Sequence, residues 1–308
     1  MRSSALTRPE DSTRLDDPRR AVAAQSTALE TLNRPFARRR EAGDYALLGR
    51  MGDLEVRLAT EPWQVTAAKR LRFEVFYEEL SATPDSAASR SRLDQDSFDP
   101  VCDHILVVDR TETGAAGIVG AYRVLRSDQA RAHGRFYSAG TFDIQPLIDR
   151  NRQLNFMELG RSCVRPAYRN KRTIELLWSG IWRYVNRHDI DVLFGCASFF
   201  GTDPDELAAP LTFLRHHALA PEPWRVAPHA GLSVAMDRMD PEMLDTRRVL
   251  AGLPPLVKGY LRLGAYVGDG AVIDRQFGTT DVLIVLPRSR IDTRYIAHFG
   301  ETGERFAG

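Results

Sequence analysis

MELGRSCVRP, residues Met157 to Pro166, is typical of a strand that runs into a turn. Yet Glu158, Arg161 and Arg165 stand where a buried strand would carry aliphatic side chains. Charged groups are costly to bury unless they are paired or used. This pattern therefore indicates a strand that ends at a site where its charges have partners or a chemical role.

The spacing of the first two charges makes a prediction about the backbone. Glu158 and Arg161 are an odd number of positions apart, so a regular strand would point them to opposite faces. A β-bulge would bring both to one side, and Gly160 between them permits one. A bulge also frees backbone N–H groups that can bind a carbonyl oxygen, as acyl transfer requires. The alternative is that Glu158 and Arg161 form a structural ion pair at a strand end.

Strand and helix patterns alternate along the chain on both sides of this stretch. Short period-2 or apolar runs predict strands at residues 53–59, 104–109, 118–125, 155–164, 191–197 and 281–286. Helical patterns cover residues 62–80, 173–188, 204–217 and 253–263. A strand pair followed by a strand–helix–strand crossover predicts an α/β fold, with a mixed sheet and helices on both faces. Such a sheet binds ligands at the carboxyl edge, to which residues 155–164 lead.

The composition excludes several classes of function. The chain has 308 residues and a net charge of +1, and it lacks a basic patch with interleaved aromatics, so we expect no nucleic-acid partner. Cys102, Cys163 and Cys196 lack CxxC spacing, and no HExxH motif surrounds His216 and His217, so we expect no metal site. No run of about 18 apolar residues or signal-peptide core is present. We expect a cytoplasmic protein.

Residues 1–45 are rich in Arg, Ser, Asp and Ala and show no sustained apolar period. This composition predicts a flexible N-terminal tail. The alternative for Arg38–Arg40 is contact with an anionic surface. The folded domain is expected over residues 46–308.

Further polar groups occur at positions where apolar residues would be ordinary. Arg72 and Phe76 are four apart and share a face of the helix predicted at residues 62–80. Asp96 and Asp99 lie in the loop-like segment LDQDSFDP, and Arg123 lies in the otherwise apolar strand GAYRVL. Each has an ordinary explanation as a surface charge or as a partner in a local salt bridge.

Taken together, these residues resemble a known pattern. RxxxF at 72–76, DxFD at 96–99, the Arg of GAYRVL and ELxR at 158–161 resemble the acyl-homoserine-lactone autoinducer synthases in order and spacing. Those enzymes have a GNAT-type fold and take their acyl group from acyl carrier protein. Three longer blocks are similar to a sister family, the ornithine N-acyltransferases: LDQDSFDPVCDHILVVD, MELGRSCVRPAYR and LPPLVKGYLRLGAYVGDGAVIDRQFGTTDVLIV.

The resemblance implies a GNAT-like sheet, mixed and mostly antiparallel, with a family-specific C-terminal block at about residues 240–290. It implies transfer of a 3-hydroxyacyl group from acyl carrier protein to the α-amino group of L-ornithine, giving lyso-ornithine lipid in the first step of ornithine lipid synthesis. The donor is then 3-hydroxyacyl-phosphopantetheine on the carrier protein, and no tightly bound cofactor is expected.

A basic loop departs from ordinary GNAT acetyltransferases, whose glycine-rich loop cradles the coenzyme A pyrophosphate at a helix start. Here the equivalent run, residues 169–173, contains no glycine but carries Arg169, Lys171 and Arg172. Such a loop suits the single phosphodiester of phosphopantetheine and the acidic protein behind it. The alternative is an Arg-rich surface turn.

Acyl transfer to an amine assigns roles to these residues. Glu158 would receive the proton of the α-amino group, and Arg161 would hold the neighbouring geometry or the substrate carboxylate. At the bulge, the backbone N–H groups of Ser162, Cys163 and Val164 would donate to the thioester oxygen. Asp96 and Asp99 would pair with a cationic substrate. Arg72 and Arg123 would bind the substrate carboxylate or brace the acidic loop.

No covalent intermediate is required, because GRSCV lacks the second glycine of a GxSxG elbow, and we expect Cys163 to be an inert, small apolar residue. The HxxxxD match at His104 and Asp109 resembles glycerolipid acyltransferases, but a strand would point the two residues to opposite faces.

Two alternatives to an ornithine enzyme are open. An autoinducer synthase would use S-adenosylmethionine as the amine, and a non-catalytic relative would bind a carrier protein or a membrane. Arg247, Arg248, Lys258 and Arg262 flank the apolar segment VLAGLPPLV, which offers peripheral contact with the inner face of the cytoplasmic membrane. Core packing is the alternative role of that segment.

Overall fold

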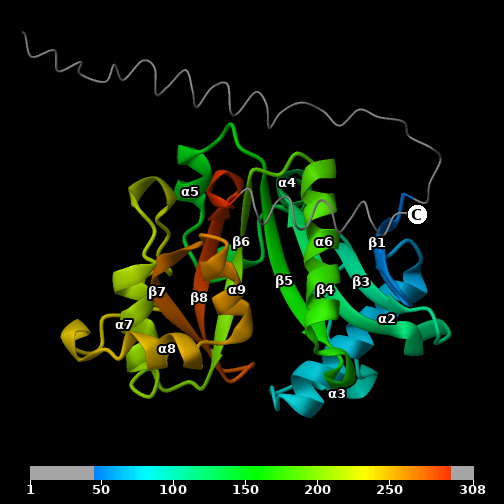
Figure 1. Ribbon diagram of the computed structural model, residues 1–308, viewed down its shortest axis with the longest axis horizontal. Coiled ribbons are helices and arrows are strands. Elements are labelled where there is room, and N and C mark those ends of the chain that lie inside the picture. The colour runs from blue at the N-terminus through cyan, green and yellow to red at the C-terminus, as the bar shows by residue number, and fades with distance from the viewer. Residues whose placement is uncertain (1–44, 293–308) are drawn as a thin grey trace, which may run out of the picture. The chain divides into compact units, whose positions relative to one another are not determined.

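The computed structural model describes residues 45–292, which fold around one sheet of eight strands with helices on both faces (Figure 1). The strand order is β1-β2-β3-β4-β5-β6-β8-β7. The bounds of the strands are β1 Leu47–Met51, β2 Leu54–Leu58, β3 Asp103–Asp109, β4 Ile118–Arg126, β5 Phe156–Val164, β6 Val192–Phe200, β7 Tyr266–Asp274 and β8 Thr279–Pro287. The tail predicted at residues 1–45 lies outside the described residues, apart from Tyr45.

Neighbouring strands are antiparallel except for β5 and β6, which run parallel. The parallel pair is joined by α6 (Lys171–Arg187), as the predicted strand–helix–strand crossover requires. The GNAT-like fold, mixed and mostly antiparallel, is therefore confirmed.

The two faces of the sheet are covered by helices of different sequence pattern. On one face α6 presents Leu177, Ile181 and Val185 at helical spacing, and all three are buried against the sheet. On the other face α2 (Pro62–Phe73) packs Ala68 and Leu71 against β3 and β4. The remaining α-helices are α3 Ser86–Ser91, α4 Ser127–His133, α5 Gln145–Arg150, α7 Ala208–His217, α8 Thr246–Gly252 and α9 Pro255–Arg262. No helix among residues 45–292 is long and apolar enough to cross a bilayer.

Two predicted helices differ at their ends. The helix expected over residues 62–80 is α-helical to Phe73 and then continues as a π-helix, Glu74–Glu79. The helix expected to start at 204 starts at Ala208, because the side chain of Asp203 accepts a hydrogen bond from the backbone N–H of Asp205 and forms a turn there.

Strands β5 and β6 separate soon after they begin to pair. Their register covers only three residue pairs, from Phe156 with Val192 to Glu158 with Phe194. At the next position Gly195 lies so close to β5 that a Cβ atom there would be 2.2 Å from the carbonyl oxygen of Leu159. Beyond this contact β6 pairs with β8 alone, and β5 has no strand partner on its β6 side. We call the space between them the β5–β6 gap, and Figure 1 shows the two strands apart there.

The predicted C-terminal block builds the second wall of this gap. Strand β8 pairs with β6 over nine residue pairs, and β7 covers the outer edge of β8. Helix α9 lies on the α6 side, where the hydroxyls of Tyr260 and Tyr122 share a buried hydrogen bond of 2.9 Å. The C-terminal block is thereby tied to β4 across the gap.

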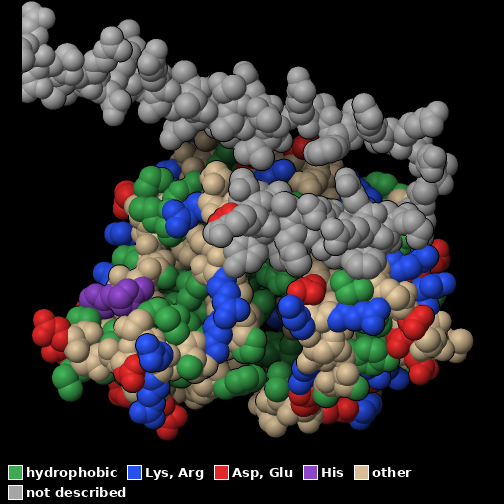
Figure 2. All heavy atoms as spheres, viewed as in Figure 1, with side chains coloured by type: hydrophobic (Ala, Val, Ile, Leu, Met, Phe, Trp, Pro, Cys, Tyr) green, Lys and Arg blue, Asp and Glu red, His purple; other side chains and the backbone are tan. Residues whose placement is uncertain are grey.

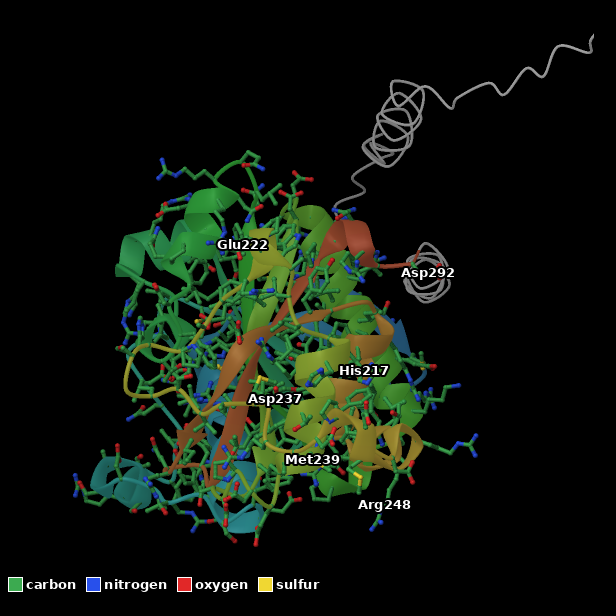
Figure 3. The ribbon with its side chains drawn as sticks, turned by 90° about the vertical axis from the view of Figure 1, so that its left-hand side faces the viewer. His217, Glu222, Asp237, Met239, Arg248 and Asp292 are labelled. Carbon is green, nitrogen blue, oxygen red and sulfur yellow. The ribbon has the colours of Figure 1, made fainter. Side chains whose placement is uncertain are left out.

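The apolar segment VLAGLPPLV does not present a continuous apolar surface. Leu253 and Val257 are buried in the core, as the core-packing alternative predicts. Leu250 is 43% exposed and lies beside Arg247 and Arg248 on α8, and the side chain of Arg248 extends outward from the molecule (Figure 3).

Candidate active site

The predicted bulge in β5 is confirmed, but Gly160 does not supply its unusual backbone angle. Arg161 and Ser162 together stand opposite Tyr122 of β4, where the register shifts. Arg161 itself has a φ of +53°, in the left-handed region that few non-glycine residues adopt. Such conformations persist where the surrounding contacts hold them, and they are frequent at functional sites. The contacts of the Arg161 side chain provide that restraint here.

Glu158 is buried at 4% exposure and does not pair with Arg161, so the ion-pair alternative is wrong. Its carboxylate accepts two backbone hydrogen bonds, from the N–H of Tyr137 and the N–H of Ser138, each 2.7 Å long. Burial raises the pKa of Glu158, and hydrogen bonding from the side chain and backbone of Ser138 and from the backbone of Tyr137 offsets part of that rise. Each oxygen keeps a lone pair, so the carboxylate holds a turn and can still accept a proton.

Three arginines and three aspartates form a closed ring in which positive and negative side chains alternate. In order around the ring they are Arg72, Asp94, Arg161, Asp96, Arg123 and Asp99. Four of the six links lie between 2.6 and 3.2 Å, which is hydrogen-bond distance. The formal charges cancel, so the ring satisfies its buried charges internally.

The two links made by Arg161 are the long ones, at 3.3 Å to Asp94 and 3.6 Å to Asp96. The Nε atom of Arg161 and the Oδ2 atom of Asp96 are buried and lack hydrogen-bond partners. The guanidinium also lies between two aromatic rings, 4.9 Å from the centroid of Tyr137 and 4.8 Å from that of Phe277. Unsatisfied buried polar atoms indicate a position for a missing partner. A ligand carrying both charges can therefore bind where the ring is weakest.

The rest of the ring is a brace for the acidic loop. Arg72 is 1% exposed and binds Asp94 through Nε, while its terminal nitrogens bind both oxygens of Asp99. Burial alone would raise the pKa of Asp99, but the hydrogen bonds from Arg72 bring it well below its usual range. Asp96 behaves in the same way, since its hydrogen bond with Arg123 outweighs its burial and lowers the pKa. Both aspartates are therefore ionised at neutral pH.

Phe76 lies in the π-helix and packs edge-to-face on Phe277, with 5.7 Å between ring centroids. Phe277 in turn contacts the guanidinium of Arg161. Phe76 therefore supports one of the two aromatic side chains around Arg161, and we assign it no direct contact with the ring of charged residues.

The basic loop leads from β5 into α6. Asn170 caps this helix by accepting a hydrogen bond from the N–H of Thr173. Arg169 pairs with Glu79 and Arg172 donates to the carbonyl of Met51, so both are held in place. Lys171 is 89% exposed, and its ammonium pairs with Glu175 at 3.6 Å. The predicted basic residues thus surround one helix start, with Lys171 projecting into solvent.

The remaining candidates lie beside this cluster without a reactive geometry. Cys163 is buried, which raises the pKa of its thiol to about 12. Ser162 turns toward the opposite face, where its side chain bonds the hydroxyl of Tyr122. His104 contacts the backbone of Asp99, whereas Asp109 binds Thr111 and Tyr168, so the HxxxxD match is not a catalytic pair.

Sequence reasoning missed Asp94, Tyr137, Ser138 and Phe277. Asp94 opens the LDQD segment, and its acidic side chain next to the predicted pair was a usable signal. Tyr137 and Ser138 act on Glu158 through backbone N–H groups, which no residue type encodes. Phe277 reaches Arg161 only because the β7–β8 turn folds back across the gap.

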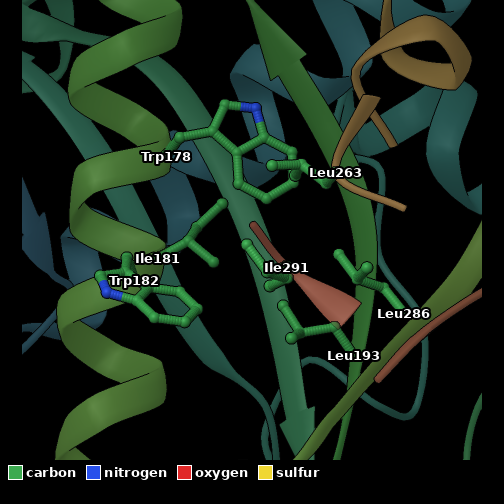
Figure 4. Close-up of a pocket in the computed structure, with 7 residues that line it drawn as sticks. All are labelled: Trp178, Ile181, Trp182, Leu193, Leu263, Leu286 and Ile291. Carbon is green, nitrogen blue, oxygen red and sulfur yellow. The ribbon is translucent and has the colours of Figure 1, made fainter. Parts of the chain in front are cut away.

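The opposite side of the β5–β6 gap is apolar. A cavity of about 10 Å³ lies on this side between α6 and the part of the sheet where β5 and β6 still pair (Figure 4), and it is lined by Trp178, Ile181, Trp182, Leu193, Leu263, Leu286 and Ile291. Figure 2 shows this face hollowed between α6 and α9, with apolar side chains in the depression. The gap therefore joins a charged site on one face to apolar surroundings on the other.

Fold and site together define an acyltransferase of the GNAT class, and residues 71–179 match the acetyltransferase (GNAT) domain family. The chain belongs to the L-ornithine N(alpha)-acyltransferase family. It is 50% identical over 266 residues to the L-ornithine N(alpha)-acyltransferase of Brucella abortus (strain 2308), an alignment that covers 86% of this chain and 95% of that protein. It is 49% identical over 263 residues to that of Rhizobium meliloti (strain 1021), covering 85% and 89% of the two chains.

Among solved structures, the chain is similar to FeeM, an N-acyl amino acid synthase from uncultured soil microbes. The TM-score is 0.44 at 11% identity, and the match covers 79% of this chain and 97% of that one.

Proposed function

We propose that this acyltransferase moves a 3-hydroxyacyl group from acyl carrier protein to the α-amino group of L-ornithine and so makes lyso-ornithine lipid. The observation that carries the proposal is the match, at 50% identity over 95% of its length, to a protein named L-ornithine N(alpha)-acyltransferase. The site chemistry supports it independently.

An amino-acid acceptor needs a cation for its carboxylate and an anion near its amine. Arg161 offers an unpartnered Nε atom, and Asp96 offers an unpartnered Oδ2 atom within the same weak segment of the ring. An amino acid bound between Arg161 and Asp96 would replace the two long contacts of Arg161 with hydrogen bonds of ordinary length. The ion pairs made by Arg72 would stay intact.

The donor side is supported by the basic loop and the open edge of β5. A phosphopantetheine arm is extended, and its amides can pair with a strand edge that lacks a partner. Its phosphodiester suits the N-terminus of α6, where Lys171 adds an exposed positive charge. Ile174 is 42% exposed on the same turn and offers an apolar contact to a carrier protein. The hollow between α6 and α9, which is lined with apolar side chains (Figure 2), suits the acyl chain.

The reaction needs only proton transfer and oxyanion stabilisation. The α-ammonium loses one proton to Glu158, directly or through water, and its nitrogen then attacks the thioester carbon. A C–N bond forms, and backbone N–H groups at the bulge of Arg161 and Ser162 stabilise the oxyanion. Collapse breaks the C–S bond, and the second proton of the nitrogen passes to the sulfur. The products are the amide and the free carrier thiol.

The decisive experiment measures the release of carrier-protein thiol from 3-hydroxyacyl carrier protein. L-Ornithine, L-lysine, glycine and S-adenosylmethionine are offered in parallel, and the products are identified by mass spectrometry. We expect thiol release and an N-acylated product with L-ornithine. Release with S-adenosylmethionine alone would identify an autoinducer synthase, and release with none of the four would support a non-catalytic relative.

A further inference from the structure

A partly buried carboxylate on the second wall of the gap has no role in the chemistry above. Asp281 is the third residue of strand β8 and pairs in register with Ser198 of β6. Its carboxylate accepts a hydrogen bond of 2.9 Å from the hydroxyl of Thr279, and the hydroxyl of Ser198 also bonds it. Among residues 45–292, no lysine, arginine or histidine forms an ion pair with it. Asp281 is thus a partly buried acid with two neutral hydrogen-bond donors and no ion-pair partner among the described residues.

Asp281 faces the charged side of the gap. Alternation along β8 puts it on the face that carries Thr279, and the turn just before them places Phe277 against Arg161. Cys196 lies two positions before Ser198 on β6, and the charges of Asp281, Glu158 and Arg161 all act on the pKa of its thiol. The acid is therefore a neighbour of the proposed acceptor site, on the wall opposite β5.

We infer that Asp281 is the binding site for the side-chain ammonium of the acceptor, an inference that rests on the proposed function. Ornithine presents one carboxylate and two ammonium groups, and the site offers one side chain for each. Arg161 binds the carboxylate, Glu158 receives the proton of the α-amino group, and Asp281 takes the distal ammonium. Thr279 and Ser198 leave lone pairs of the Asp281 carboxylate free for the N–H donors of that ammonium.

Partial burial makes Asp281 selective. The pKa of its carboxyl group is raised by burial, so ionisation there requires a cation nearby. An acceptor with the same carbon chain but no distal ammonium leaves the carboxylate without a charged partner. A hydrogen bond to a charged group contributes about 1.5–3 kcal/mol, which corresponds to roughly 10- to 100-fold in kcat/KM.

The test compares L-ornithine with L-norvaline, which has the same carbon chain and lacks the distal amine. Wild type is expected to favour ornithine by about 10- to 100-fold in kcat/KM. In Asp281→Asn the KM for ornithine rises and this preference falls toward unity, while kcat/KM for norvaline is unchanged. Asp143→Asn is the matched control, because Asp143 is an exposed aspartate whose side chain does not contact the described residues of the site; it keeps the wild-type preference.

Three results would overturn the inference: no preference for ornithine in wild type, an unchanged preference in Asp281→Asn, or an equal loss of kcat with both acceptors. If wild type acylates neither amine, the proposed function fails on its own, and calorimetric titration with L-ornithine decides the remaining question. Weaker binding by Asp281→Asn than by Asp143→Asn then supports the ammonium site, whereas equal binding, or none by wild type, refutes it.

Discussion

Glu158→Gln is the substitution that best separates catalysis from architecture at this site. Glutamine has the same shape as protonated glutamate, so the two backbone N–H groups of Tyr137 and Ser138 meet one oxygen and one NH₂ group instead of two oxygens. One N–H therefore loses its acceptor, which costs about 1–3 kcal/mol of folding stability. Removal of a buried charge offsets part of this cost, because burial raises the pKa of Glu158.

The expected loss of activity is larger than the loss of stability. A positioned general base contributes about 10²- to 10⁴-fold to the rate, so turnover in Glu158→Gln falls by at least about 100-fold while the protein stays folded. A base must be unprotonated to act. The rate in wild type therefore rises as pH rises through the raised pKa of Glu158, and the residual rate in the variant lacks that dependence.

The assay is thiol release from 3-hydroxyacyl carrier protein with L-ornithine, measured from acidic to neutral pH beside urea unfolding of the same samples. Glu55→Gln is the matched control, because Glu55 is also buried in the sheet, at 6% exposure, but pairs with Arg50 on β1. Glu55→Gln is expected to lose stability and keep its turnover. Wild-type turnover in folded Glu158→Gln would refute the role of Glu158 as the base.

Three further substitutions test separate parts of the site. Arg72→Met takes from two buried aspartates their shorter ion pairs, leaving only Arg161 for Asp94 and Arg123 for Asp99, and should lower the free energy of unfolding in urea by about 3–5 kcal/mol; a loss below about 1 kcal/mol would show that the ring is not a brace. Cys163→Ala should keep wild-type turnover, since a thiol with a pKa of about 12 is not a nucleophile at neutral pH; inactive but folded protein would contradict this. Lys171→Glu should raise the KM for the acyl carrier protein by about 3- to 10-fold at low salt and leave transfer from a free acyl-pantetheine donor unchanged. The same charge reversal at Arg131, exposed on α4, should leave the KM for the carrier protein unchanged.

Much of the fold was predictable because its strands are bounded by clear turns and its main helix is strongly amphipathic. Strand β7 was missed for a physical reason, since YVGDGAVID contains glycine at 268 and 270 and lacks a run of apolar residues. A register shift between Val267 and Ala271 accommodates those residues, and pairing with β8 holds the strand. Pairing with β8 therefore makes residues 266–274 a strand, although their local sequence does not favour one.

At the site, unusual residue types were predictable and their partners were not. The charges of MELGRSCVRP correctly indicated a bulge, yet Arg161 rather than Gly160 adopts the left-handed backbone, because ring contacts hold its side chain. The partner of Glu158 is a pair of backbone groups, and those of Arg161 come from distant segments. Such partnerships arise from chain folding, which spacing along one strand does not report.

The pairing of β6 with β8 also bears on the order in which the protein is made. Strand β6 emerges from the ribosome before β8. Its outer edge therefore has no strand partner until about eighty more residues have been synthesised. A free edge of this length is a template for pairing with other chains. Nascent chains and fragments that stop short of residue 279 are therefore expected to aggregate when unprotected, and they lack Asp281. Catalytic competence begins only when the second wall of the gap has been translated.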